Sequence, residues 1–469
     1  MTKKQILWLL LFLLLLILII WYKCCRPDSP KVSNHVPNQL IVNFNGNNLS
    51  GFKNDVNRLG YKIKATCPCS DSLILLEDTL GRVDLNPDGN VKGSIKDYGG
   101  DGTQVSRNYT FDQGSFEGYK GRLGQPIENP NTNNRDGIFR YPKPINPVST
   151  VIVSTVDSGV DTANFQLKSR LFRNATNSTY CGTTNLEGIY GLNIPFVMGR
   201  ATAGETVEPK DNNGHGTFIN GIIAGVATVD TSDQNLVNLF TGGGDNHNVA
   251  IQQLNVSFSS SNASSGTLFD ALCGIHYSLK KGAKVINASW GLVTYGDSIK
   301  EVAIFKPTLE AIVQSDAVLV VSAGNDSINF DTDADRRLAW PAAFSRPRTI
   351  ANMPFDYSKN VITVGAWNLQ NGGNIAYFSN RGSLVDVYAP GFNILSLERN
   401  ATSKYVKDRL NNKGTSFAAP FIARTAAILR GLKISKTAAD IKQAIVGSSV
   451  TSPTNGTVHL VRHNNALAQ

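Results

Sequence analysis

The sequence has no dense block of lysine and arginine, although its formal net charge is +9 at pH 7. Nucleic-acid-binding proteins usually gather basic side chains into such a block, so we expect no nucleic acid partner and a solvated, mildly basic surface. A zinc site is not indicated either, because Cys67 and Cys69 have no partner pair at the spacing that zinc sites use. We therefore assign no metal to the chemistry of this chain.

Long apolar runs are absent from the chain except at residues 6–22, which are mostly Leu and Ile. As a helix this run is ~25 Å long, slightly short of the ~30 Å bilayer core, and Trp21 and Tyr22 suit the membrane–water interface. A cleaved signal usually has a shorter run followed by small residues, whereas Lys-Cys-Cys-Arg-Pro follows here. We favour an uncleaved transmembrane anchor, formed by residues 1–23, rather than a signal peptide that is removed. In both cases the chain crosses a membrane, and we expect the remainder to face outward.

Cysteine is scarce, with six residues among 469. An even number in an exported chain permits disulfides, but the spacing does not settle how they pair. Cys24 and Cys25 would lie beside the membrane, where lipidation is an option, although their surroundings do not resemble a bacterial lipoprotein cleavage site. Cys273 lies in a helical pattern and is expected to be a buried free thiol.

The segment that follows the anchor has three parts. Residues 24–36 form a polar, Pro-containing linker, and residues 37–79 predict a small α+β module in the order strand, helix, strand, strand. Residues 80–145 are rich in Gly, Asn, Asp and Arg and show no clear period, which indicates a linker or an extended arm lying on the domain that follows. The expected elements of the module are strands over 39–44, 61–65 and 73–77 and a helix over 50–59.

From residue 146 to residue 469, short Val/Ile-rich runs alternate with helical patterns. The runs do not alternate polar with apolar residues, which is typical of parallel strands covered on both faces. Alternation of strand and helix predicts an α/β fold with a doubly wound, mostly parallel sheet and helices on both faces. The expected strands cover 151–156, 249–254, 283–287, 317–322 and 361–364, and the expected helices include 268–281 and 299–314.

Three short motifs carry reactive side chains. Asp157 ends the first of these strands in Asp-Ser-Gly, and His215 opens an apolar helix in His-Gly-Thr. Ser416 begins a helix over 417–432 in Gly-Thr-Ser-Phe-Ala-Ala-Pro, where Pro420 is acceptable if it falls among the first four N–H groups, which lack intrahelical partners. Each residue alone has an ordinary structural explanation, since a serine at a helix start is usually a cap.

Together and in this order, the motifs resemble those of the subtilisin family of serine proteases. The resemblance covers about residues 148–469. It implies that Ser416 attacks the scissile carbonyl, that His215 transfers the proton, and that Asp157 orients and stabilises the imidazole. Asn325, in Ala-Gly-Asn-Asp, matches the oxyanion stretch of the family. Its amide would donate to the developing oxyanion together with the backbone N–H of Ser416.

Other segments that match the family lie where a peptide substrate would bind, beyond the carboxyl ends of the strands. The resemblance implies an edge that pairs with an extended peptide, with Trp290 walling an apolar pocket. Residues 340–344 match the loop near the first specificity pocket, and with Ala339 and Trp340 there an apolar or medium-sized residue is expected before the cleaved bond. The residues expected to contact substrate are Ser289, Trp290, Gly291 and Gly324.

The chain also departs from the family pattern. Phe218 and Phe421 stand where the family often has histidine, and Arg424 stands where it often has glycine. None of the three is a catalytic position, so the departures bear on packing. The proposed chemistry requires no cofactor. Structural calcium is common in the family, but no ligand set can be assigned in this sequence.

The module over 37–79 loosely resembles the inhibitory propeptide that precedes many members of the family, which would make an intramolecular contact with the protease. A membrane-proximal spacer is an equal alternative. The predicted function is that of a membrane-anchored serine endopeptidase, extracytoplasmic and single-pass, that hydrolyses protein or peptide substrates through an acyl-enzyme. The rival is a catalytically silent peptide-binding protein on the same scaffold, which the presence of all three reactive residues and Asn325 disfavours.

Overall fold

The structure is a computed structural model. It describes residues 34–81, 103–112, 149–201, 203–225, 228–229, 249–258, 265–334, 336–369, 373–397, 399, 412–432, 436–451 and 459–460. These residues belong to one compact unit, Ser33–Gln469. The predicted anchor over 6–22, with Cys24 and Cys25, lies outside the described residues. Among the helices that are described, none has the length and apolar character needed to span a bilayer.

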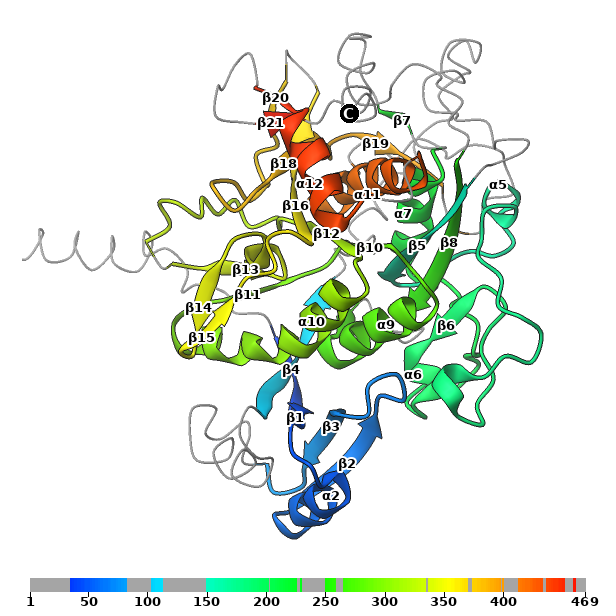
Figure 1. Ribbon diagram of the computed structural model, residues 1–469, viewed down its shortest axis with the longest axis vertical. Coiled ribbons are helices and arrows are strands. Elements are labelled where there is room, and N and C mark those ends of the chain that lie inside the picture. The colour runs from blue at the N-terminus through cyan, green and yellow to red at the C-terminus, as the bar shows by residue number, and fades with distance from the viewer. Residues whose placement is uncertain are drawn as a thin grey trace, which may run out of the picture. The chain divides into compact units, whose positions relative to one another are not determined.

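A mostly parallel sheet lies at the centre of the C-terminal part (Figure 1). Within the described residues its strand order is β20-β21-β18-β16-β12-β10-β5-β8-β6, with β17 paired to β16. Only the β16–β17 and β20–β21 pairs of this described sheet are antiparallel. The predicted α/β fold with a parallel sheet is confirmed. The strands are β5 (Ser149–Asp157), β6 (Gly191–Asn193), β8 (Val249–Ser257), β10 (Val285–Ala288), β12 (Val318–Ser322), β16 (Val361–Asn368), β17 (Asn374–Ile375), β18 (Val387–Pro390), β20 (Val450–Thr451) and β21 (His459–Leu460).

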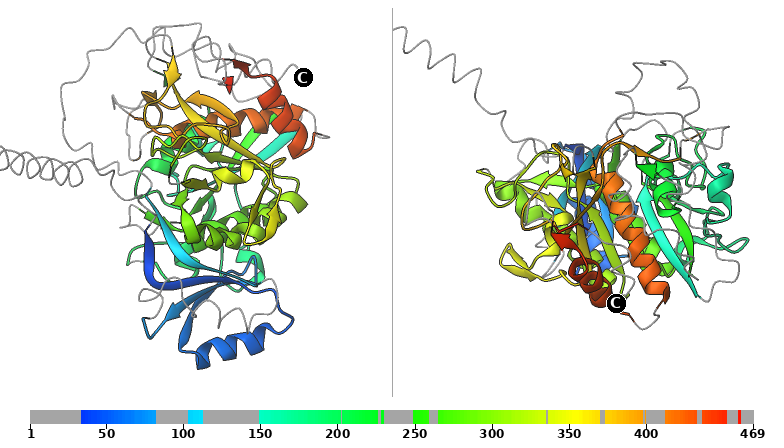
Figure 2. Two further views of the ribbon diagram at one scale, coloured as in Figure 1. Left: turned by 90° about the vertical axis from the view of Figure 1, so that its left-hand side faces the viewer. Right: turned by 90° about the horizontal axis from the view of Figure 1, so that it is seen from above.

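Helices cover both faces of this sheet, as strand β5 shows (Figures 1 and 2). The side chain of Val153 joins an apolar cluster with residues of α7, α11 and α12. The next residue, Ser154, points to the opposite face, where its hydroxyl lies 2.6 Å from that of Ser278 on α9. The helices are α7 (His215–Ile223), α11 (Thr415–Leu432) and α12 (Ala438–Gly447) on one face, and α9 (Leu268–Lys280) and α10 (Lys306–Gln314) on the other.

The helix expected over 299–314 is divided in the structure. A 3-10 helix, η3 (Gly296–Phe305), precedes α10, which begins at Lys306. Pro307 stands in the first turn of α10. Proline is well tolerated in the first turn of an α-helix, whereas in a helix interior it removes a hydrogen bond and its ring clashes with the preceding turn, which favours a break at this position. The spacing of apolar residues therefore indicated a helical segment correctly, but it did not distinguish the 3-10 helix from the α-helix.

Smaller elements complete the C-terminal part. The short strands pair as β11 (Leu292–Thr294) with β13 (Leu338–Trp340), β14 (Arg348–Ile350) with β15 (Met353–Phe355), and β7 (Thr228–Val229) with β19 (Ile394–Leu395). The short helices are α5 (Phe165–Lys168), η2 (Tyr180–Gly182), α6 (Ile194–Val197) and η4 (Ala342–Ser345).

A second sheet contains the predicted small module. We call residues 34–81 and 103–112 the N-terminal module. Its sheet has the order β2-β3-β1-β4-β9, in which β9 comes from the C-terminal part of the chain. Helix α2 begins after Asn48, whose side chain accepts a hydrogen bond from the N–H of Gly51. The elements are β1 (His35–Asn43), α2 (Leu49–Arg58), β2 (Tyr61–Thr66), β3 (Leu73–Asp78), β4 (Gln104–Asp112) and β9 (Ser265–Thr267).

Strand β4 was not predicted from the pattern of residues, which indicated only a linker or arm over 80–145. Its sequence offers little apolar signal, because the buried positions include Ser106 and Asn108, both 0% exposed. Asn108 is satisfied by tertiary partners, since its amide donates to Gln39 and its carbonyl accepts from the N–H of Phe269. The strand therefore depends on partners that are remote in sequence.

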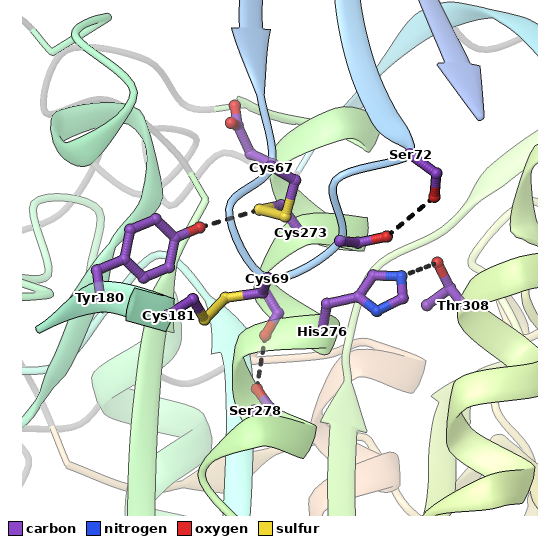
Figure 3. The surroundings of a disulfide bond; sticks show 12 residues. Cys67, Cys69, Ser72, Tyr180, Cys181, Cys273, His276, Ser278 and Thr308 are labelled. Carbon is purple, nitrogen blue, oxygen red and sulfur yellow. Dashed lines mark hydrogen bonds between the residues drawn. A yellow bond between two sulfur atoms is a disulfide. The ribbon is translucent and has the colours of Figure 1, made fainter. Parts of the chain in front are cut away.

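Two disulfides join the N-terminal module to the C-terminal part, Cys67–Cys273 and Cys69–Cys181 (Figure 3). The expectation that Cys273 is a free thiol is therefore wrong. The paired cysteines are 206 and 112 residues apart. The spacing of the cysteines in the sequence does not reveal these pairs, because pairing depends on which cysteines the fold brings together.

Candidate active site

The side chains of Asp157 and His215 form a buried hydrogen-bonded pair. Asp157 is the last residue of β5 and His215 is the first residue of α7. Asp157 Oδ1 lies 2.8 Å from His215 Nδ1 and also accepts a hydrogen bond from the N–H of Ser158. The two side chains are 1% and 2% exposed, so water hardly screens their interaction. This geometry fixes the orientation of the imidazole ring.

A second carboxylate, Asp211, holds the turn that presents His215. Its Oδ1 accepts from the N–H groups of Asn213 and Gly214 and from the hydroxyl of Ser158. Its Oδ2 accepts from the N–H and the hydroxyl of Thr217. Asp211 thereby satisfies donors at the start of α7, which have no partner within the helix. Sequence analysis missed this residue, although Asp four residues before a helix-opening histidine was a usable signal.

The charge state of His215 results from opposing effects. Burial, the largest effect, disfavours the charged imidazolium and lowers the pKa. The charge and hydrogen bond of Asp157, together with the charge of Asp211, outweigh burial and raise the pKa of His215 above the ordinary 6.5. His215 is therefore a stronger base than a free histidine, and its protonated form is stabilised in place.

Ser416 lies in the first turn of α11, one residue after its start. Its hydroxyl donates to the carbonyl oxygen of Ser289, 3.0 Å away, in the segment that follows β10. The ring of Phe417, the next residue, lies 5.6 Å from the His215 ring between centroids. Helix starts and strand ends thus place all three predicted catalytic residues at one edge of the sheet. The described hydrogen bonds join Asp157 to His215 directly, and Ser416 to Ser289.

Pro420 does not fall where sequence analysis placed it. Because α11 begins at Thr415, Pro420 lies beyond the first turn, and the carbonyl of Ser416 loses the helical N–H that it would normally accept. The hydroxyl of Ser289 donates to this carbonyl at 2.7 Å and replaces the missing bond. Ser289 therefore stabilises the start of the helix that carries Ser416.

Asn325 follows β12 and faces the same helix start. Its Oδ1 accepts hydrogen bonds from the N–H and the hydroxyl of Thr415, both at 2.9 Å, which leaves the amide Nδ2 as donor. A Cβ placed on Gly414 would lie 3.7 Å from both Asn325 Nδ2 and the backbone nitrogen of Ser416. The absent side chain of Gly414 thus leaves the space between these two donors open.

Gly324 gives the Asn325 loop its shape. Its φ of +99° is one that side-chain-bearing residues rarely adopt, and a Cβ there would lie 2.4 Å from Asn380 Nδ2. The amide of Asn380 in turn accepts from the N–H groups of Asp326 and Ile328 and donates to Ala323. Asn325 is therefore held by a closely packed turn.

Residues 149–464 match the sequence model of the subtilase family, which is more than half of the chain. The chain belongs to the subtilase family. It is 30% identical over 270 residues to a subtilase-type proteinase of the sexual differentiation process in Schizosaccharomyces pombe, covering 55% of this chain and 46% of that protein. It is 32% identical over 264 residues to alkaline protease 2 of Aspergillus fumigatus, covering 53% and 44%. The aligned part therefore spans less than half the length of these curated relatives.

Among solved structures, this subtilase is similar to fervidolysin from Fervidobacterium pennivorans, a keratinolytic enzyme related to subtilisin. The TM-score is 0.59 at 19% sequence identity, and the match covers 94% of this chain and 62% of that one. At this identity the likeness concerns the fold. Its extent shows that the similarity of fold reaches into residues before 149, where the family match begins.

Trp290, one of the residues expected to contact substrate in this subtilase, is covered by the chain's own strand β4. Strand β4 pairs antiparallel with β9, with Phe111 opposite Gly266. The Phe111 ring stacks on that of Trp290 at 4.6 Å between centroids, and Phe258 meets both rings edge-on at 6.0 Å. Trp290 is only 3% exposed, and its indole N–H donates to the carbonyl of Val156, the residue before Asp157. Trp290 thus packs in an aromatic cluster with Phe111 and Phe258.

The loop expected near the first specificity pocket is mostly interior. Trp340 is 0% exposed and its indole N–H donates to Thr294 at 2.8 Å, while Ala339 is 5% exposed. Trp340 pairs with Leu292 through β11 and β13. Its contribution to specificity would therefore come through the packing beneath the site, since its ring does not reach the surface.

The departures from the family pattern are packing positions, as expected. The ring of Phe218 packs at a tilt against that of Phe417, the residue after Ser416, with 4.6 Å between centroids. Arg424 is 8% exposed and donates to the carbonyl of Ile223 at the end of α7. Phe421 belongs to the apolar cluster that also contains Phe218 and Phe417.

In the part of the chain that the structure describes, no group of three or more His, Cys, Asp or Glu side chains could hold a metal ion. The expectation about structural calcium stays untested.

Proposed function

We infer that the chain is a serine endopeptidase that hydrolyses protein or peptide substrates through an acyl-enzyme on Ser416. The observation that carries this proposal is the buried Asp157–His215 pair beside the helix start that bears Ser416. A fluorophosphonate probe tests it, since such probes react only with an activated serine. Peptide mapping should find the label on Ser416. Absence of label from both the intact chain and a chain freed of its N-terminal module would favour the rival, a silent peptide-binding scaffold.

In the proposed reaction the Ser416 hydroxyl turns from the Ser289 carbonyl and donates to Nε2 of His215. As the oxygen attacks the scissile carbonyl, His215 takes the proton, and Asp157 stabilises the resulting imidazolium. His215 then gives the proton to the leaving amine. Water hydrolyses the acyl-enzyme by the same sequence of proton transfers. These steps require no cofactor.

The two donors beside Gly414 would bind the oxyanion of the tetrahedral intermediate. Replacing Asn325 by Ala removes one of them, and kcat should fall about 10²- to 10³-fold, a range measured on subtilisin itself. KM should change little, because the oxyanion is absent from the bound substrate and develops only as the transition state is approached. Steady-state kinetics on a peptide substrate measures both values. Asn185→Ala, an exposed position on another loop, is the matched control, and an unchanged kcat for Asn325→Ala would rule out this role.

The raised pKa of His215 predicts the pH dependence of activity. The general base must be neutral, so activity is lost as the pH falls through the pKa of His215. Because that pKa lies above 6.5, the acid limb of kcat/KM should have its midpoint above pH 6.5. A pH profile measured in wild-type and Asp157→Asn protein checks this, since the variant should shift the midpoint downward. A wild-type midpoint below 6.5 would contradict the prediction.

In this proposal the N-terminal module acts as an intramolecular inhibitor of propeptide type. The pairing of β4 with β9 and the burial of Phe111 against Trp290 support this role, because together they hold β4 against Trp290, a residue expected to contact substrate. A pure spacer would have no reason to cover that residue. The same contact predicts that substrates present an apolar, preferably aromatic, residue to the Trp290 pocket.

The proposed enzyme is anchored in the cell membrane by residues 6–22, with its catalytic domain outside the cytoplasm. The two disulfides support this location, because disulfides form and persist mainly in oxidising compartments. Fractionation of membranes, followed by protease protection of the catalytic domain, tests both the anchor and its orientation. Recovery of the full-length chain in the soluble fraction would contradict the anchor.

A further inference from the structure

The two disulfides attach one turn of the N-terminal module to two separate elements of the peptidase domain (Figure 3). Cys67 and Cys69 lie between β2 and β3. Cys273 lies within α9, and Cys181 lies in η2. Residues 113–148 join the module to the peptidase domain along the chain, so the disulfides are a second and a third covalent connection.

Non-covalent contacts hold strand β4 at the same domain. The guanidinium of Arg107 forms a paired salt bridge with Glu301 of η3, and the Arg107 N–H also donates to that carboxylate at 2.8 Å. Both side chains are largely buried, at 14% and 4% exposed. Together with the β4–β9 ladder and Phe111 on Trp290, these contacts place the module across the substrate edge.

If the module were joined to the peptidase domain only by the main chain, a cut within residues 113–148 would free it. Here such a cut leaves β1–β4 covalently bound through Cys67 and Cys69. We propose that the module is a covalently retained inhibitor, which leaves the substrate edge only after a thiol reductant has opened both disulfides. This inference rests on the proposed inhibitory role of the module and adds redox control to it.

Tethering matters because it keeps the inhibitor at a high effective concentration. A linked module rebinds in an intramolecular step, and such linkage commonly strengthens association about 10²- to 10⁴-fold without any new contact. Dilution after a chain cut therefore cannot release the module while either disulfide is intact. Loss of both tethers turns inhibition into a reversible bimolecular equilibrium that dilution does shift.

Exposure predicts the order of reduction. Cys69 is 8% exposed and Cys181 is partly exposed, whereas Cys67 and Cys273 are both 0% exposed. A thiolate of a dithiol reductant attacks one sulfur of Cys69–Cys181, and the other cysteine leaves as a thiolate. The second thiol of the reductant then displaces the attacked cysteine and closes the reductant's own disulfide. Each disulfide takes up two electrons and, after protonation, becomes two thiols. The buried Cys67–Cys273 disulfide should be reduced second.

The test uses the full chain with a recognition sequence for a site-specific protease inserted within residues 113–148. After cleavage, one half is kept oxidised and the other is treated with dithiothreitol, and the freed thiols are alkylated. Both are diluted, assayed on a short chromogenic peptide and separated by gel filtration. The oxidised sample should retain the module and hydrolyse on the order of 10²-fold more slowly than the reduced sample. Equal activities, or a module that stays bound after all four cysteines are alkylated, would overturn the proposal.

Cysteine variants locate the effect. The pair Cys69→Ala with Cys181→Ala keeps one tether and should remain inhibited after cleavage, as should Cys67→Ala with Cys273→Ala. The fourfold variant should be active after cleavage without reductant; if it does not fold, the chemically reduced wild type answers the same question. Fluorophosphonate labelling of the reduced, separated enzyme distinguishes failure of the proposed protease activity from failure of the proposed tethered inhibitor. No label there refutes the proposed protease, whereas strong label in the oxidised, cleaved sample refutes only the tethered inhibitor.

Discussion

Replacing Ser416 by Ala should lower kcat by about 10⁶-fold, which is the scale measured for the nucleophile of subtilisin itself. The alanine removes the only oxygen that can form the proposed acyl-enzyme at this helix start. KM and the thermal unfolding midpoint should hardly change, because Ser416 is partly exposed and its hydroxyl donates a hydrogen bond of 3.0 Å to the Ser289 carbonyl. Active-site titration with a burst substrate should fall to zero.

The matched control for this variant is Ser358→Ala, which removes a hydroxyl that donates to Asp356, remote from the proposed site. Its activity should equal that of the wild type. Full hydrolysis by highly purified Ser416→Ala protein would refute the proposed mechanism. Loss of activity together with loss of the folded state would instead indicate a structural role for Ser416.

Replacing Asp157 by Asn should lower kcat by about 10⁴-fold, since the charge that stabilises the imidazolium is lost while the side-chain shape is kept. The environment magnifies the effect. Asp157 is 1% exposed and lies 2.8 Å from His215 Nδ1, so little water is present to replace its charge. The pKa of His215 should fall in the variant, because burial would then act with less opposition. NMR titration of the His215 ring and single-turnover kinetics measure the two consequences separately.

Asp356→Asn, a carboxylate at an exposed position, is the matched control and should leave both quantities unchanged. A drop in kcat without a change in the His215 titration would mean that Asp157 acts by positioning alone. A variant as active as the wild type would exclude the Asp157–His215 pair from the chemistry, whatever its geometry.

Much of the peptidase domain was predictable because its signals are local. The buried strands that carry the site are runs of Val and Ile, and each of the five expected strands is present, as β5, β8, β10, β12 and β16. Asp157 and His215 occupy the strand end and the helix start that their motifs indicated. Such elements follow from short-range patterns, because a strand covered on both faces needs apolar residues at every position.

Other features depended on contacts that no local pattern encodes. Strand β4 buries Ser106 and Asn108 and is recognisable only with β1 and β9 in place. The partner of Cys273 lies 206 residues away. The support of α11 by Ser289 became visible only when the structure placed Pro420 beyond the first turn of the helix.

The sequence by itself determined the chemistry that this subtilase offers, since the reactive residue types, their motifs and their order along the chain are properties of the covalent polymer. Tertiary structure alone decided what has access to that chemistry. Hydrogen bonds of a strand edge, the stacking of Phe111 on Trp290 and the pairing of cysteines are all contacts between distant segments. Their partners are chosen by the folded geometry, because the free energy of such contacts exists only once the segments have been brought together.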